Sequence, residues 1–164
     1  MKKISKLISL ILCLSLLCPT VAYAAETKQT TDSPNMKDIL IDSTDPMGPG
    51  EGLFTEEFYT NVKRSLKPGG IVAAQSESPF VNKEEIKKMY TLLKKVFPIC
   101  ATYTSNIPTY PGGYWAWAFC SETVEPLSYW DERRGEAITK TCKIYNKDYH
   151  NARFALPNYL KELL

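Results

Sequence analysis

Residues 38–54 read DILIDSTDPMGPGEGLF, and this stretch indicates the fold of the chain. It opens with Ile39-Leu40-Ile41, a short apolar run that ends in Asp42. Such a run is typical of a buried parallel strand whose polar residues emerge at its carboxyl end. The segment 46–50 contains two prolines and two glycines, which extend neither a helix nor a strand, so it predicts a loop. We therefore expect a parallel strand that leaves the sheet directly into a loop.

Further along the chain, helices and strands alternate. The apolar spacing predicts a helix containing Phe58, Val62 and Leu66, a strand at 71–74, a helix from Asn82 to Phe97, aromatic strands at 103–107 and 114–120, a helix at 131–141 and a short helix after Pro157. This order implies parallel pairing in a doubly wound α/β sheet, and the last two strands are expected to add an antiparallel edge.

Two local patterns mark the ends of helices. Lys67-Pro68-Gly69-Gly70 is expected to stop the first helix. Asn82, with Glu85 three residues later, predicts a capping box at the start of the second helix.

In a doubly wound sheet, ligands bind beyond the carboxyl ends of the strands. The segments 42–49, 75–79 and 108–113 are expected to share that rim. Asp42 and Asp45 place two carboxylates three residues apart, which suits a diammonium ligand and a nucleophilic amine that must lose a proton. The alternative is that both aspartates only form Asx-type turn hydrogen bonds.

Other residues near this rim also have two interpretations. Gln75 ends a strand and is open to a purely structural role toward loop backbone groups. Tyr110 and the aromatic stripe at 114–117 are equally compatible with packing, because aromatic side chains mostly contribute buried area. Glu77 reads as a solvated rim charge, and His150 as a surface or C-terminal packing residue.

Residues 1–24 resemble a signal peptide, with lysines followed by an apolar run that is short for a membrane span of about 20 residues. An uncleaved anchor is the alternative, so the leader predicts export or membrane association. Residues 25–35 predict a disordered linker.

The leader holds three of the 20 basic residues and none of the 18 acidic ones, and the remaining charges interleave. This pattern argues against a nucleic-acid surface.

The cysteines outside the leader are Cys100, Cys120 and Cys142. Three widely spaced cysteines predict neither a complete disulfide framework nor a zinc site. Their usage is that of a reducing compartment, which conflicts with the leader.

The chain resembles the spermidine synthases in separate blocks over 36–164. These are Asp42-Ser43-Thr44-Asp45-Pro46-Met47-Gly48-Pro49, the segments 66–70 (LKPGG), 74–79 (AQSESP) and 107–115 (IPTYPGGYW), and near the end 145–146 (YN) and 154–157 (FALP). The resemblance implies that 36–164 is the C-terminal part of a catalytic domain. Its fold would be the C-terminal half of a Rossmann-like sheet of the adenosylmethionine-dependent transferase type, with helices on both faces and a signal-like helix in front.

The resemblance also implies a reaction, in which putrescine takes an aminopropyl group from decarboxylated S-adenosylmethionine to give spermidine and methylthioadenosine. Asp42 matches the general base and Asp45 the carboxylate that holds the diamine. The remaining matched positions are Gln75 and Tyr110 in the diamine channel, Ser43 and Thr44 as further substrate-binding residues, and Pro49 against the thioadenosine. No metal or resident cofactor is implied, because the sulfonium is already an activated leaving group.

The family's N-terminal β-domain and its glycine-rich loop, which holds the donor, have no counterpart before Asp38. We therefore expect little aminopropyl transfer from the chain alone, and an exposed strand edge at Ile39. A complementary N-terminal half or a full-length synthase is the expected partner. The alternatives are a non-catalytic module that binds polyamine and, less specific to this signature, another transferase with an adenosylmethionine-type donor.

Overall fold

The computed structural model describes residues 36–43, 48–110, 112–128 and 130–164. Its strands are β1 (Met36–Ile41), β2 (Leu66–Gln75), β3 (Ile99–Asn106) and β4 (Tyr114–Ser121). Its helices are the 3-10 helix η2 (Gly48–Phe54), α2 (Glu56–Ser65), α3 (Lys83–Val96), α4 (Glu132–Thr141), α5 (Lys147–Arg153) and α6 (Asn158–Lys161). The predicted leader (1–24) and linker (25–35) lie outside the described residues. None of the helices described here has the length and apolar character needed to cross a bilayer.

The strands form one mixed sheet in the order β1-β2-β4-β3. β1 and β2 are parallel, whereas β4 runs antiparallel to both β2 and β3. The predicted parallel pair and the antiparallel final strands are confirmed. Because β2 and β3 each run antiparallel to β4, they run in the same direction and end at the same edge of the sheet.

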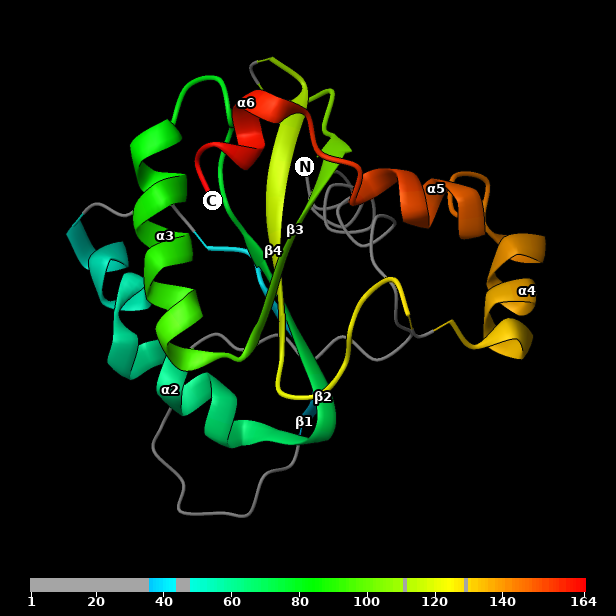
Figure 1. Cartoon of the computed structure of the whole chain (residues 1–164), viewed down its shortest axis with the longest axis horizontal. Helices are drawn as coiled ribbons and strands as arrows, with labels where there is room; N and C mark the ends of the chain where they lie inside the picture. Colours follow the sequence, from blue (N-terminus) through cyan, green and yellow to red (C-terminus); the bar gives the residue numbers. More distant parts are fainter. Residues whose placement is uncertain (1–35, 44–47, 111, 129) are drawn as a thin grey trace, which may run out of the picture.

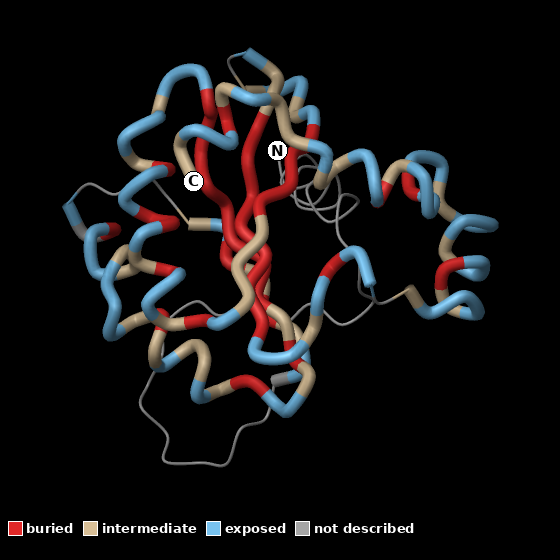
Figure 2. The backbone as a smooth tube through the Cα atoms, in the orientation of Figure 1, coloured by how far each residue is buried: buried red, intermediate tan, exposed pale blue. Residues whose placement is uncertain are grey.

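β4 divides its side chains strictly between the two faces of the sheet. Ala116, Ala118 and Cys120 join the core beneath α2 and α3, together with Tyr59 of α2 and the stripe Ile86, Met89, Tyr90 and Leu93 of α3. Figure 1 shows α2 and α3 on this one side of the sheet. In Figure 2 the strands are buried over most of their length, and the outer faces of these helices are exposed. The alternation follows from the two-residue period of a strand.

The opposite face carries Tyr103, Trp115, Trp117 and Phe119, against which Phe154 packs. Phe154 follows α5, a helix that the apolar pattern did not predict, because its seven residues are mostly polar. Its signal in the sequence is Asn146, whose side chain accepts a hydrogen bond from the Tyr149 N–H and caps the helix. His150 is buried between the Tyr145 hydroxyl and the Pro126 carbonyl, 2.9 Å from each, which makes it a C-terminal packing residue.

Two predicted boundaries are wrong. Helix α2 ends at Ser65, directly before the residues expected to stop it, but β2 begins at Leu66 and not at 71, so residues 67–70 lie inside the strand. There the pairing with β1 jumps from Met36↔Leu66 to Asp38↔Ile71. A bulge absorbs the extra residues because Gly69 takes a positive φ of 74°. The predicted loop at 46–50 overlaps η2, which starts at Gly48; Pro46 and Met47 lie outside the described residues. A 3-10 turn accepts Pro49 near its start, since the first N–H groups of a helix have no partner within it.

The predicted capping box at α3 does not form. Asn82 stands at the N-cap position, but its side chain accepts no backbone hydrogen bond there. Its own N–H donates to the Ser78 carbonyl (2.9 Å), so Glu85 is not needed to satisfy it.

Candidate active site

The ends of β1 and β2 bring the first two predicted residues together. Ile41 pairs with Ala74 in the parallel register, and each is followed directly by a predicted site residue, Asp42 and Gln75. Since parallel strands end at the same edge of a sheet, the two side chains belong to one rim. Ser43, half-buried, follows Asp42 on the way out of the sheet.

The segment after β2 is buried, although most of it is polar. Gln75, Ser76, Glu77 and Ser78 are each less than a tenth exposed. The Ser76 N–H donates to the Ala116 carbonyl, and the Ala116 N–H donates to the Glu77 carbonyl, both at 3.0 Å. These bonds extend the contact with β4 beyond Gln75 and fix the backbone of Glu77.

Glu77 is the functional candidate that the sequence interpretation missed. It was expected to be a solvated rim charge, but it is only 6 % exposed and its backbone has a positive φ of 71°. Its carboxylate accepts long hydrogen bonds from Gln75 Nε2 (3.5 Å) and Asn82 Nδ2 (3.4 Å). A strained backbone that holds a buried carboxylate is a feature of functional sites. The sequence feature that could have identified Glu77 is the unbroken polar run 75–78 directly after a buried strand.

The connection between β3 and β4 supplies the third part of the rim. The Ile107 N–H donates a 2.8 Å hydrogen bond to the Gly113 carbonyl. The Tyr110 N–H donates to the Ile107 carbonyl and the Tyr110 carbonyl accepts from the Gly113 N–H, both at 3.0 Å. Gly112 and Gly113 have positive φ angles of 80° and 62°, which other residues rarely adopt. The turn holds the half-buried Tyr110 with its ring centroid 4.7 Å from that of Trp115. In Figure 1 this turn and the β2–α3 connection lie at the same end of the sheet.

The charges on two parts of the rim act on the hydroxyl of the third. Burial raises the pKa of the Tyr110 hydroxyl, and the negative charges of Asp42 and Glu77 raise it further. Although Asp42 reaches the surface, the surrounding protein displaces enough water to raise the pKa of its carboxyl. We call Asp42, Gln75, Glu77 and Tyr110 the rim site. It combines two carboxylates with a neutral amide and a neutral phenol, a set that favours a cationic ligand.

The remaining predicted residues are placed only in part. Thr44 and Asp45 lie outside the described residues, and of Pro49 only the backbone in η2 is described. Within the described ranges, no group of three or more His, Cys, Asp or Glu side chains is arranged to hold a metal ion. An open hollow formed by parts of β3, 125–128 and the C-terminal segment shares no residue with the rim site.

Curated relatives of the chain are polyamine aminopropyltransferases. The chain is 46% identical over 128 residues to the one from Alkaliphilus oremlandii and 47% identical over 128 residues to the one from Clostridium perfringens strain SM101. Each match covers 77% of this chain and 45% of the relative. The chain therefore spans somewhat less than half the length of these relatives.

Solved structures agree with these sequence matches. A spermidine synthase crystallised with the transition-state analogue AdoDATO aligns with a TM-score of 0.75 and 40% identity, covering 80% of this chain and 45% of that one. Spermidine synthase from Thermotoga maritima aligns with a TM-score of 0.73 and 39% identity, covering 80% and 44%. The sequence profile of the spermine/spermidine synthase domain matches residues 17–128, more than half of the chain. The chain belongs to the spermine/spermidine synthase family.

Proposed function

We propose that this chain carries the diamine-binding side of an aminopropyltransferase that converts putrescine and decarboxylated S-adenosylmethionine to spermidine and methylthioadenosine. The observation that supports this most directly is the rim site, where the charges of Asp42 and Glu77 both act on Tyr110. The curated relatives carry the name of this transferase activity.

Diamine recognition follows from charge. Alkylamines resemble the lysine side chain, whose pKa is about 10.4, so putrescine is a dication at neutral pH. The carboxylates of Asp42 and Glu77 attract such a ligand, and Asp45, three residues after Asp42 in the sequence, is proposed as a third carboxylate. The paired rings of Tyr110 and Trp115 offer an apolar surface for the methylene chain. Gln75 Nε2, bonded to Glu77, orients that carboxylate.

In the transfer step, one amine nitrogen attacks the carbon of the aminopropyl group bound to the sulfonium. The carbon–sulfur bond breaks and its electron pair stays on sulfur, which becomes the neutral thioether of methylthioadenosine. The nitrogen must give up a proton, and we assign Asp42 as its acceptor. The raised pKa of the Asp42 carboxyl makes it a stronger base than an ordinary aspartate, which suits this role. Ser43, Thr44 and Pro49 are proposed as further substrate and donor contacts, and no metal or resident cofactor takes part.

A second candidate function is a non-catalytic module that binds polyamine or pairs with a complementary half or a full-length synthase. It needs only the site for a cationic ligand at the rim, where the buried Glu77 carboxylate and the Asp42 carboxylate lie near Tyr110. Under this proposal the rim site still binds putrescine, but the chain transfers no aminopropyl group alone.

Two measurements test these proposals. Isothermal titration with putrescine and with methylthioadenosine reports on the two sides of the site, and transfer of a labelled aminopropyl group reports on catalysis. We expect measurable putrescine binding that Asp42→Asn weakens, with Asp148→Asn, an exposed acid on α5, as the matched control. Transfer that Asp42→Asn abolishes supports the enzyme, and putrescine binding without transfer supports the module. Putrescine binding unaffected by Asp42→Asn would contradict both.

A further inference from the structure

Two of the three cysteines outside the leader, widely spaced in the sequence, are neighbours in the folded chain. Cys100 on β3 stands directly opposite Cys120 on β4 in the antiparallel register. Their Sγ atoms are 3.8 Å apart, and the Cys120 thiol donates a hydrogen bond to Cys100 Sγ. Cys142 lies after α4, where its sulfur accepts a hydrogen bond from the Tyr145 N–H. All three are free thiols.

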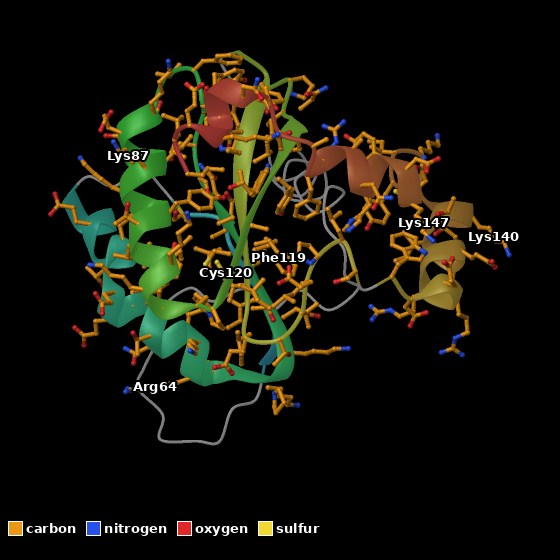
Figure 3. The ribbon with its side chains drawn as sticks, in the orientation of Figure 1. Arg64, Lys87, Phe119, Cys120, Lys140 and Lys147 are labelled. Atoms are coloured by element: carbon orange, nitrogen blue, oxygen red, sulfur yellow. The ribbon has the colours of Figure 1, made fainter. Side chains whose placement is uncertain are left out.

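The geometry of the pair suits a covalent bond. Residues directly opposite in antiparallel strands have Cα atoms about 4.5–5.5 Å apart. Disulfides bridge Cα separations of about 4.4–6.8 Å, a range that contains this spacing. Both sulfurs face the core beneath α3. In Figure 3 Cys120 lies on that side of β4 and Phe119 on the opposite side.

The environments of the two thiols differ. Cys120 is fully buried, whereas Cys100 is half-buried on the edge strand of the sheet. The hydrogen bond from Cys120 lowers the pKa of Cys100, and the positive charge of Lys94 lowers it further. The same hydrogen bond and burial raise the pKa of Cys120. Because the thiolate is the reactive form, Cys100 is the thiol that reacts first.

We propose that Cys100 and Cys120 are an oxidation site that closes to a cross-strand disulfide by exchange with a small-molecule disulfide. The Cys100 thiolate attacks one sulfur of the reagent, and one thiolate leaves. Cys120 then loses its proton, and its sulfur attacks Cys100 Sγ and displaces the second thiolate. One reagent disulfide is reduced to two thiols while the two cysteines are oxidised. The bond ties edge strand β3 to β4, and it is independent of aminopropyl transfer.

The test uses the full chain carrying Cys13→Ser and Cys18→Ser, so that only the three described cysteines react. The protein is incubated with oxidised glutathione, remaining thiols are alkylated, and the products are mapped by mass spectrometry. No lysine or arginine lies between Val96 and Glu132, so trypsin leaves both cysteines in one peptide. Closure makes this peptide lighter by two hydrogens, and chymotrypsin then yields two fragments joined by the bond. We expect this product as the major one, with Cys142 alkylated.

Unfolded protein provides a matched control. Cys100 and Cys120 are 20 positions apart and Cys120 and Cys142 are 22 apart, so loop-closure entropy in urea favours neither pair. In the folded chain we expect the Cys100–Cys120 bond to form at least tenfold more than the Cys120–Cys142 bond. In urea this preference should be lost. Cys142→Ser should leave closure unchanged, and Cys100→Ser should abolish it. The proposal is overturned if Cys142 forms the major bond in the folded chain, if the preference persists in urea, or if both thiols stay alkylatable in folded protein while urea allows the bond.

Discussion

The side-chain amide of Asn82, at the first position before α3, donates a 3.4 Å hydrogen bond to Glu77 Oε2 and caps no backbone group of the helix. A residue type normally used to start a helix is here directed at a buried carboxylate of the rim site. The amide nitrogen Nδ2 of Asn82 reaches Glu77, while its oxygen Oδ1, the atom that would cap a helix, makes no capping bond. This makes Asn82 a positioning residue for Glu77.

Asn82→Ala is therefore expected to separate stability from binding. Losing a true N-cap costs about 1 kcal/mol, but Asn82 makes no capping bond. Its bond to Glu77 is long at 3.4 Å, and Gln75 still donates to that carboxylate, so removing Asn82 should cost less than about 0.5 kcal/mol in urea unfolding. Putrescine affinity should fall, because Glu77 loses a donor that orients it. Asp131→Ala is the control, since Asp131 Oδ1 caps α4 through the Arg134 N–H at 2.9 Å. It should lose about 1 kcal/mol and keep its affinity. The reverse pattern would contradict the assignment.

Asp42→Asn should raise stability at neutral pH while weakening diamine binding. The folded chain holds the pKa of Asp42 above its unfolded value of about 3.9, so folding favours the protonated form. The contribution of Asp42 to stability is thus present below that pH and is lost as the pH rises through the raised pKa. The variant should melt higher at pH 7, with the difference vanishing below about pH 3.9. Binding should weaken on the order of tenfold, as for loss of a charge-assisted contact. Equal melting temperatures at pH 7 would contradict the pKa direction.

Tyr90→Phe removes one buried hydroxyl that ties α3 to the sheet. That hydroxyl donates a 3.0 Å hydrogen bond to the carbonyl of Trp117, with both residues almost fully buried. We expect a loss of about 1–2 kcal/mol in the free energy of unfolding, because a buried acceptor loses its partner. Thr91→Ala, an exposed neighbour whose hydroxyl bonds only within its own helix, should change stability far less. Similar losses in both variants would refute the importance of this contact.

Gly135→Ala should destabilise the chain, although glycine inside a helix normally costs up to about 1 kcal/mol relative to alanine. An added Cβ would lie 2.2 Å from a ring atom of Trp130, and Trp130 stacks against Tyr145. The rigid ring would have to move, so the melting temperature should drop. Gly52→Ala in η2 meets nothing within 4 Å and should be neutral or stabilising by about 0.4–1 kcal/mol. A higher melting temperature for Gly135→Ala would contradict this prediction, because it would mean that the Trp130 ring moves aside without cost.

The positions of the strands could be predicted from the sequence better than the residues at which they begin and end. The apolar run 71–74 and the apolar stripe of α3 repeat with the spacing of a strand or a helix, so their burial can be predicted from nearby residues alone. The start of β2 was placed at 71 instead of Leu66, because the bulge at 67–70 depends on the partner strand, which local composition does not encode. The same holds for Asn82, whose hydrogen-bond partner is decided by the fold and not by its position in a capping pattern.

The candidate site shows the same division. Asp42, Gln75 and Tyr110 were predicted from strand ends and family blocks, and the structure gathers them at one rim. Glu77 was missed because its burial depends on β4 covering the segment after β2. The Cys100–Cys120 pair was missed because strand register, not sequence spacing, brings the two residues together.

The strand order also constrains when the sheet can assemble. β4 is the last strand in the chain, yet it lies between β2 and β3. During synthesis β3 is made before β4, its only partner in the described sheet, so it cannot pair until residue 121 has been made. β2 and the Tyr110 turn likewise cannot meet before that point. The last-made strand is thus the one that closes the structure, and a ribosome stalled before it would hold β1, β2 and α3 with an open, aggregation-prone edge.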